Sequence, residues 1–472
     1  MFVTNTLLDP KIDQLSPDER KEWLWDLWRN QLEYAVASET PAIIQILKDN
    51  GLELSDFQEP DDLLKFPIIT KQTFRKIGDT AFLPRKYREA LRCGQHGLKD
   101  HEVLHVFPRF TGGSTVQKLS DYTLIRWSIS DWLGAMQSST RGIKQSNLEI
   151  GFPANAFSNY TFDHIAAPFF TGVIMYNGGN YVPRHINLSD IDAFNMIRMK
   201  ECDGIISPPA AHQLKGRGLV ELLAGDTDID NPYVTGKNIK LIIVSSTPFT
   251  GRIHELFEQR GIPVKDGGGS TDVGAVLWNC TEDPLRFHSI EGNVLNEVVD
   301  RNGLPVRDGE SGLFLCSRIA GVVEADPYLR RLHHDVNSVT TNLTSGGELP
   351  DDTRKRVSRI IGRDVLSLNS EELESLRQGV NAEYLESNRL VPNQATQLLR
   401  YSGLMNETQF FAPAQCSCGK NTAKMKGLNR THDFDSSPAD LERPVVVEET
   451  VARSDISGYH LRLPDGCAIV ER

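Results

Sequence analysis

A short segment rich in glycine and hydroxyl groups, Phe110 to Lys118, is well suited to bind an anion. It reads Phe-Thr-Gly-Gly-Ser-Thr-Val-Gln-Lys. Glycine permits backbone conformations in which several N–H groups converge on one anion, while Ser, Thr and Lys118 add hydroxyl donors and a positive charge. The spacing of a Walker A loop is absent. The segment therefore suits a polyphosphate, and a plain surface turn is the alternative interpretation.

Three cysteines and one histidine form a second group with possible chemistry. Cys416 and Cys418 stand in a tight Cys-x-Cys-Gly turn, and Cys280 lies shortly before His288. Three thiolates and one imidazole are typical ligands of a closed, tetrahedral, structural zinc site. Because the two halves are far apart in the sequence, buried thiols and a core histidine remain the alternative.

Length and charge limit the classes of protein that this chain can represent. It has 472 residues, is 39% hydrophobic and carries a formal net charge of -12. That length favours two or more domains, and the acidic balance argues against non-specific nucleic-acid binding. The N-terminus has no signal-peptide pattern, no apolar run is long enough to span a bilayer, and seven cysteines make a disulfide framework improbable. We therefore expect a cytoplasmic protein without membrane or nucleic-acid partners.

The elements around the glycine-rich segment predict how it is positioned. Ser16-Pro17-Asp18-Glu19 has the pattern of a helix start with a capping box. Residues 101–107 have the alternation of a strand leading into the segment, and residues 121–136 have helical spacing after it. This order predicts a strand, a glycine loop and a helix whose N-terminus faces the anion.

Residues 240–274 have the pattern of a βαβ unit. A buried strand at 240–244 precedes the loop Ser245 to Pro248, a helix at 252–260, a short strand at 262–265, and a second glycine loop from Asp266 to Asp272. Such a unit implies a parallel pair of strands, with both loops at their carboxyl ends.

The later part of the chain changes character. Residues 293–317 have the pattern of antiparallel strands, residues 318–396 are polar and mostly helical, and residue 397 onward resumes a strand. We predict an α/β fold with parallel or mixed sheets and flanking helices. Its expected parts are an N-terminal core (1–280), a β-rich subdomain (281–317 and 397–433), a helical insertion (318–396) and a short C-terminal tail (434–472).

Three motifs in order resemble the adenylate-forming superfamily, most closely its phenylacetate–coenzyme A ligase-like branch. Thr111 to Lys118 resembles the family's phosphate loop, Gly268 to Gly274 its Tyr-Gly-x-Thr-Glu motif, and Leu399 to Gly403 its Arg-Tyr-x-x-Gly-Asp strand. Residues 65–71 and 296–312 add weaker support, and residues 429–433 resemble the hinge. The match covers about residues 50–317 and 397–433.

The resemblance implies roles for individual residues. The Thr111–Thr115 loop would hold the β- and γ-phosphates of ATP, Thr271 would contact the α-phosphate, and Asp272 would replace the glutamate that binds Mg²⁺. Gly268 and the Ser245–Pro248 loop would flank the adenine, and Lys118 is our candidate for the catalytic lysine. The residues expected to contact the nucleotide are Thr111, Gly112, Gly113, Ser114, Thr115, Ser245, Ser246, Thr247, Pro248, Gly268, Gly269, Ser270, Arg400 and Arg430.

The implied activity is ATP-dependent activation of a small organic acid, with an aryl acid favoured, as an acyl-adenylate. The acyl group would then pass to a thiol or amine acceptor: coenzyme A, a carrier protein or an amine. The resemblance also supports Zn²⁺ at Cys280, His288, Cys416 and Cys418 as a structural ion. The sequence departs from the family at Val116, at Ser245–Thr247, at Leu404 and in a tail without lysine. The alternative is therefore a relative that has lost adenylation and acts as a binding or scaffold protein, or that runs a different condensation.

Overall fold

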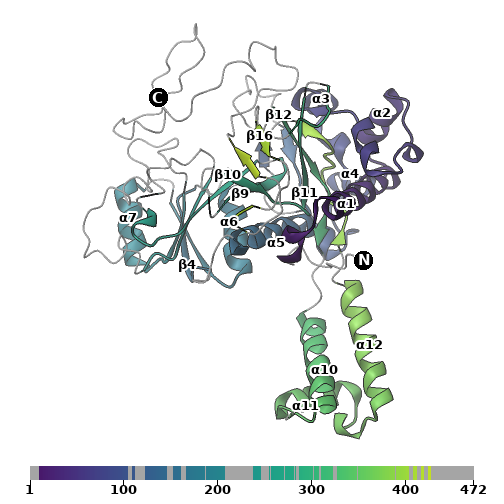
Figure 1. The fold of residues 1–472 in the computed structure, drawn as a ribbon, viewed down its shortest axis with the longest axis vertical. Helices are drawn as coiled ribbons and strands as arrows, with labels where there is room; N and C mark the ends of the chain where they lie inside the picture. Colours follow the sequence, from purple (N-terminus) through teal and green to yellow (C-terminus); the bar gives the residue numbers. More distant parts are fainter. Residues whose placement is uncertain are drawn as a thin grey trace. The chain divides into compact units, whose positions relative to one another are not determined.

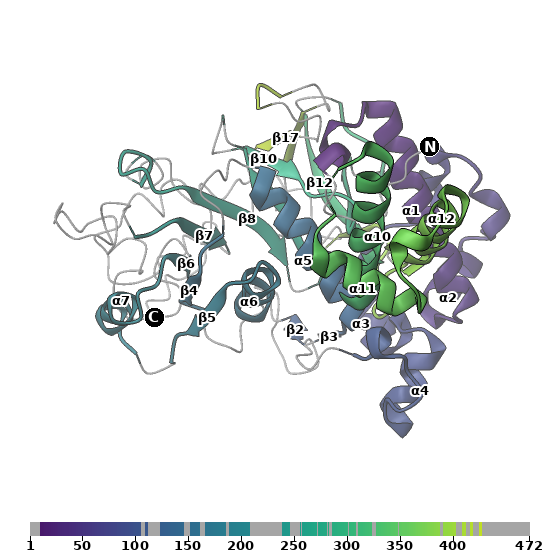
Figure 2. The ribbon, with the colours of Figure 1, turned by 90° about the horizontal axis from the view of Figure 1, so that it is seen from below.

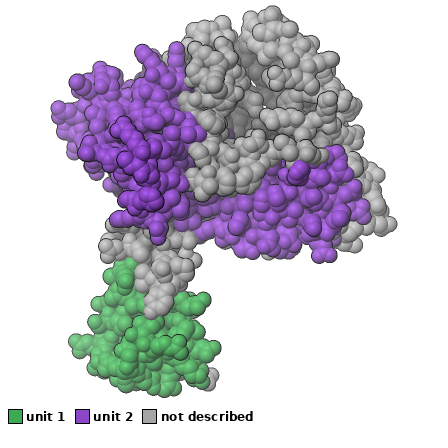
Figure 3. All heavy atoms as spheres, turned by 180° about the vertical axis from the view of Figure 1, so that it is seen from behind, with its two compact units in different colours: residues 1–6, 322–391 green, residues 7–321, 392–472 purple. Residues whose placement is uncertain are grey.

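The structure, a computed structural model, describes most of the chain as two compact units. One unit is residues 322–391, and the other is the rest of the described chain, up to residue 321 and from residue 392 (Figure 3). Each has its own hydrophobic core. The described residues are 10–104, 109–111, 123–145, 152–160, 166–185, 188–207, 238–245, 255, 257–270, 272–280, 282, 286–300, 302–307, 310–322, 327–347, 349–387, 390–402, 408–411, 416–418 and 424–426.

A 13-stranded mixed sheet organises the larger unit. Its strands run in the order β1 (Ile69–Thr70), β15 (Tyr401–Ser402), β12 (Ser311–Arg318), β16 (Thr408–Phe411), β17 (Lys424–Lys426), β10 (Arg286–Ser289), β9 (Gly274–Asn279), β8 (Val264–Ser270), β7 (Leu241–Ser245), β6 (Gly204–Ser207), β4 (Asn155–Ser158) and β5 (Asn180–Pro183), with β11 (Val294–Val299) paired to β12. The expected α/β fold with mixed sheets is confirmed. Strands that we expected in a separate β-rich subdomain belong to this same sheet, and the domain division stays a prediction.

The strands from β8 to β5 form the parallel half of the sheet (Figure 2). Alternate residues of β6 and β7 pack on opposite faces: Ile206 and Ile243 join the main core with α6 (Ala166–Tyr176), whereas Ile205 and Ile242 join a second core with α7 (Asp190–Met199). Burial on both faces explains the uninterrupted apolar runs in these strands.

The pairing of β7 with β8 confirms the predicted parallel pair, whose expected helix at 252–260 lies partly outside the described residues. The second glycine segment is not a loop. β8 continues through Gly267, Gly268 and Gly269 to Ser270, and β9 pairs with it antiparallel with a register shift between Gly268 and Gly269. A Cβ atom on Gly269 would lie 2.3 Å from the Gly274 carbonyl oxygen. The glycines therefore permit a close approach of two strands.

The surroundings of the first glycine segment also differ from the prediction. Residues 100–102 form a 3-10 helix where we expected a strand. β2 (Arg109–Thr111) and β3 (Thr123–Ile125) pair as an antiparallel hairpin, and helix α5 begins only at Ile129 and ends at Gln145. The first described element after the glycine-rich segment is therefore strand β3, where we expected a helix.

Helices of the N-terminal region pack beside the β1 end of the sheet (Figure 1). They are α1 (Pro17–Ala37), α2 (Pro41–Asp49), α3 (Lys71–Ile77) and α4 (Arg85–Cys93), with 3-10 helices at Pro10–Gln14, Leu54–Asp56, Pro60–Lys65 and Asp79–Phe82. The predicted capping box forms, since Ser16 and Glu19 exchange side-chain and backbone hydrogen bonds. Trp28 is fully buried, with its ring 5.6 Å from that of Phe57 and 5.8 Å from that of Phe66.

The smaller unit consists of three helices with a core of their own. They are α10 (Pro327–Ser345), α11 (Asp351–Ile361) and α12 (Ser370–Ser387), with a 3-10 helix at Val365–Ser367. Val336, Val339, Val357 and Leu373 are buried together among them. A further two-stranded sheet pairs β13 (Gly321–Val322) with β14 (Leu390–Val391). Within the described chain, no helix is both long and apolar enough to cross a membrane.

Candidate nucleotide site

Three segments that are distant in the sequence meet at the end of the sheet formed by β1 and β15. The parallel pairing of these strands places Thr70 opposite Ser402 and Ile69 opposite Tyr401. Thr70 caps α3 by accepting a hydrogen bond of 2.9 Å from the Thr73 N–H. Tyr401 in turn reaches the turn between β8 and β9, where its hydroxyl lies 3.3 Å from Asp272 Oδ2.

Asp272 is a buried carboxylate surrounded by positive charges. It is 3% exposed. Burial raises its pKa, and this rise is opposed first by the charge of Lys71, then by the hydrogen bond from Tyr401 and by the charges of Arg318 and Arg75. Two of these cations, Lys71 and Arg75, lie one helical turn apart on α3. Charges from two elements therefore converge on one carboxylate.

Lys71 is the most unusual member of this cluster. It is the first residue of α3, and only 6% of its surface is exposed. The structure gives its ammonium group no hydrogen bond and no ion pair among the residues that it describes. A buried cation without a close partner is costly, so such a group is expected where an anionic ligand supplies the missing charge.

Arg318 lies behind Asp272, at the end of β12. Its guanidinium carbon is 3.8 Å from the centre of the Trp127 ring, and its Nη2 is 3.6 Å from Asp131 Oδ2. Burial lowers the pKa of Arg318 to about 10, against the opposing charges of Asp131 and Asp272. The side chain therefore stays positive at neutral pH, because that pKa lies well above it.

The turn that carries Asp272 requires glycine at its end. Gly274 has φ +86, and a Cβ atom there would lie 3.0 Å from the Trp127 ring. Positive φ is accessible to glycine without steric cost. Val273, between Asp272 and Gly274, is fully buried and fixes the turn against the core.

Only part of the expected nucleotide-binding set lies within the described residues. Ser245 ends β7, where its hydroxyl donates to the Gly267 carbonyl (2.8 Å), and its own carbonyl accepts a hydrogen bond of 2.7 Å from Tyr160. Thr111 ends β2, and Gly268, Gly269 and Ser270 lie in β8. Outside the described residues lie Gly112, Gly113, Ser114, Thr115, Lys118, Ser246, Thr247, Pro248, Thr271 and Arg430.

Arg400, which we expected to contact the nucleotide, is buried among acceptors from the protein itself. It is 2% exposed, and its Nη1 donates to the carbonyls of Leu64 and Phe66 at 3.1 and 2.8 Å. Its Nη2 donates to the Gly303 carbonyl at 2.7 Å, and its Nε lies 3.1 Å from Glu297 Oε1. Every guanidinium nitrogen thus has a protein acceptor, and contact of Arg400 with the nucleotide stays a prediction.

The four expected metal ligands lie together on neighbouring strands. Cys280 follows β9, His288 lies in β10, and Cys416 and Cys418 precede β17, which pairs with β10. Their ligand atoms all lie within 4.8 Å of one another. The Cys280 and Cys416 sulfurs are 3.8 Å apart, and Cys418 Sγ is 3.3 Å from His288 Nε2. Tetrahedral zinc with ordinary bond lengths separates its ligand atoms by about 3.5–3.8 Å, so this set fits the ion.

Several residues of the site were not assigned a role from the sequence. They are Lys71, Arg75, Arg318 and Tyr401. A signal existed for two of them: Lys71 directly follows the capping Thr70, and Arg75 lies four positions later on the same face of that helix. Nothing in the sequence indicated Arg318, because its proximity to Asp272 depends on the pairing of β12 with β15.

Solved structures show which proteins share this fold. 2-Hydroxyisobutyryl-CoA ligase, in an open conformation with 2-HIB-AMP and CoA, is similar with a TM-score of 0.61 and 12% identity over 96% of this chain and 85% of that one. Its postadenylation state with 2-HIB-AMP gives a TM-score of 0.60 at 12% identity, over 96% and 76%. No protein-family model matches the chain. The fold is that of an adenylate-forming ligase.

A curated relative gives a more specific similarity. Phenylacetate–coenzyme A ligase of Escherichia coli (strain K12) is 25% identical over 371 residues, which cover 77% of this chain and 75% of that protein. Together with the fold, this relative confirms the resemblance to the adenylate-forming superfamily and to its phenylacetate–coenzyme A ligase-like branch.

Proposed function

We propose that this protein is an ATP-dependent ligase that activates a small organic carboxylic acid as an acyl-adenylate. In the first step, a carboxylate oxygen of the acid attacks the α-phosphorus of ATP, and pyrophosphate leaves. In the second step, a thiol attacks the acyl carbon and AMP leaves. The fold and the similarity to a phenylacetate–coenzyme A ligase support this reaction class.

The observation that carries the proposal is the buried Lys71, whose charge acts on Asp272 and whose ammonium group has no hydrogen bond or ion pair among the described residues. An ammonium group without a protein partner can neutralise charge on a polyphosphate as pyrophosphate forms, and such fixed charges stabilise a transition state without reorganisation. Arg75 and Arg318 add positive potential. Asp272 would hold Mg²⁺, because a carboxylate is the kind of oxygen ligand that proteins use for this ion, and the ion would neutralise phosphate charge.

We further propose an aryl acid as substrate and coenzyme A as acceptor. The relative's printed name, phenylacetate–coenzyme A ligase, supports both choices. A carrier protein or an amine is the alternative acceptor. For the acid, a panel of aryl and aliphatic carboxylates separates the candidates, because each productive acid releases pyrophosphate before any acceptor is added.

We also propose structural Zn²⁺ at the cluster of Cys280, His288, Cys416 and Cys418, and a cytoplasmic location. The ligand distances support zinc. No disulfide joins the six cysteines that the structure describes, in keeping with a reducing compartment. Zinc here would join the β9–β10 region to the segment before β17 and contribute to folding rather than to chemistry.

Acid-dependent release of pyrophosphate from ATP is the decisive experiment. Lys71→Ala should lower kcat/KM for ATP by about 10²- to 10³-fold, the usual effect of removing one preorganised charge from a transition state. Lys76→Ala is the matched control, because Lys76 lies on the same helix and is exposed.

Two results would contradict the proposal. Wild-type protein that neither binds ATP nor releases pyrophosphate with any acid of the panel would exclude adenylation. Release that is equally fast in wild type, Lys71→Ala and Lys76→Ala would retain the reaction but remove Lys71 from the site.

A further inference from the structure

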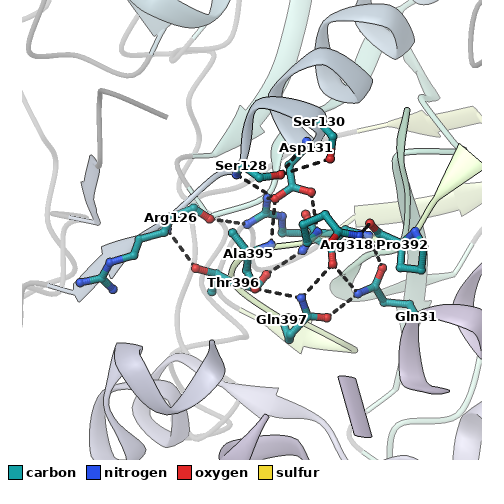
Figure 4. Close-up of polar contacts among 12 residues, drawn as sticks. Gln31, Arg126, Ser128, Ser130, Asp131, Arg318, Pro392, Ala395, Thr396 and Gln397 are labelled. Carbon is teal, nitrogen blue, oxygen red and sulfur yellow. Dashed lines mark hydrogen bonds and ion pairs between the residues drawn. The ribbon is translucent and has the colours of Figure 1, made fainter. Parts of the chain in front are cut away.

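We infer that Thr396 is a positioning residue for the hairpin β2–β3, which carries the glycine-rich segment. The inference rests on the proposed nucleotide site, because that segment is its expected phosphate loop. Figure 4 shows the polar contacts from which the role follows. They join the segment 392–397 to Arg126, the residue that directly follows β3.

Thr396 holds the backbone of Arg126 on both sides. The Arg126 N–H donates to Thr396 Oγ1 at 2.9 Å, and the Thr396 N–H donates to the Arg126 carbonyl at 3.3 Å. Arg318 Nη1 reaches the same carbonyl at 3.4 Å. Thr396 is fully buried, so water cannot replace the hydroxyl as an acceptor.

Asp131 fixes the segment that contains Thr396. Its carboxylate accepts hydrogen bonds from the N–H groups of Gln394 (2.6 Å) and Ala395 (3.0 Å), and it lies 3.6 Å from Arg318. The Ser128 N–H donates to it at 3.0 Å. Asp131 is fully buried and belongs to α5, which packs in the main core.

The other side of the segment is tied to α1. The Asn393 N–H donates to Gln31 Oε1 at 2.6 Å, Gln31 Nε2 donates back to the Asn393 carbonyl at 2.9 Å, and Gln31 also contacts Gln397. The Gln397 N–H donates to the Phe82 carbonyl at 2.8 Å. Residues 392–397 are therefore anchored to three separate elements, and Thr396 transmits this fixed position to the hairpin.

The hairpin has one further anchor among the described contacts. Asp79 Oδ2 accepts a hydrogen bond of 2.8 Å from the Leu124 N–H and lies 3.6 Å from Arg126 Nη1. Asp79 is partly exposed, whereas Thr396 is buried. Loss of the Thr396 hydroxyl would leave the Arg126 N–H without its acceptor, and the exit of the hairpin would shift.

The test compares Thr396→Val, which removes the hydroxyl at nearly constant volume, with Thr396→Ser, which keeps it. We expect Thr396→Val to raise KM for ATP about tenfold, with kcat and KM for the acid changed less than about twofold, and Thr396→Ser to restore the wild-type values. Hydrogen exchange should accelerate in peptides covering 109–126 in Thr396→Val alone.

Thr340→Val is the matched control. Thr340 is also buried, but its hydroxyl donates to the Val336 carbonyl within α10. Thr340→Val should leave KM for ATP and hydrogen exchange at 109–126 unchanged. Equal exchange at 109–126 in wild type and Thr396→Val would overturn the inference, as would a rise in KM for ATP that Thr396→Ser shares. Should wild type lack ATP-dependent activity, the proposed function fails, while the exchange measurement still decides the role of Thr396.

Discussion

At the scale of single residues, this protein concentrates buried charge in one place. Lys71 and Asp272 are both buried, and Lys71 has no hydrogen bond or ion pair among the residues that the structure describes. Arg400 shows the contrary arrangement, since Glu297 and three carbonyls saturate its guanidinium. The first pattern is typical of ligand sites and the second of structural ion pairs.

The pKa of Asp272 gives a pH prediction. Burial raises the pKa of Asp272 in the folded state above the ordinary value of 3.8. The contribution of the protonated Asp272 to the free energy of unfolding is therefore complete below pH 3.8. It is lost as pH rises through the folded-state pKa. Asp272→Asn should therefore gain stability relative to wild type as pH increases. Urea unfolding at a series of pH values from 4 to 8 measures this difference. A stability difference for Asp272→Asn that stays constant across this pH range would contradict the assignment.

At the scale of elements, pairing between distant strands decides which side chains meet. β1 carries α3 and Lys71 to Tyr401 through its parallel pairing with β15, and β12 brings Arg318 alongside. The turn between β8 and β9 presents Asp272 to them. Each contributing element is short, so its terminal hydrogen bonds matter for the geometry of the site.

The N-cap of α3 is the simplest of these terminal bonds to test. Thr70→Ala removes the acceptor of the Thr73 N–H and should cost about 1 kcal/mol of unfolding free energy. It should also raise KM for ATP, because α3 positions Lys71. Thr70→Ser should retain both values. Denaturant titration and steady-state kinetics measure the two effects, and a stability loss without any change in KM would separate the cap from the site.

The cluster at the centre of the sheet gives a metal prediction. Cys416→Ser should release about one zinc per chain and lower the melting temperature, because a thiolate ligand is lost from a closed site. Metal analysis and thermal melts measure this, with Cys93→Ser, an exposed cysteine outside the cluster, as control. Wild-type protein that is stable and free of metal would exclude the structural ion.

At the scale of the whole molecule, the chain builds two units with separate cores. The helical unit has a small core of valines and leucines, and residues 322–391 interrupt the sequence of the larger unit without interrupting its sheet. Local opening of the two cores should therefore have separate free energies.

Val357→Ala tests this independence. Val357 is fully buried in the helical unit, and its truncation should cost about 1–3 kcal/mol through lost contacts and a residual cavity. Hydrogen exchange should accelerate in α10, α11 and α12 and stay unchanged in β6, β7 and β8. Uniform acceleration across both groups would show that the two cores open together.

The sequence predicted regular local features well and long-range ones poorly. The capping box at Ser16 and the parallel unit at β7 and β8 follow from local patterns, and both form. The helix expected at 121–136 forms only from Ile129, as α5, because Thr123–Ile125 form β3, whose pairing with β2 decides their conformation. The role of Arg318 could not be predicted either, because pairing between strands distant in the sequence brings its neighbours together, and no local pattern indicates that pairing.

The hydrogen bond between Gln31 and Asn393 joins residues 362 positions apart in the sequence. The pairing of β1 with β15 likewise joins an early strand to a late one. On a ribosome, the first helices emerge long before the segment that completes their packing. The side chain of Gln31 on the first of these helices therefore lacks its partners Asn393 and Gln397 until nearly the whole described chain has been synthesised. Because the N-terminal helices are synthesised first, they must be kept from non-native contacts until the C-terminal segment can pack against them.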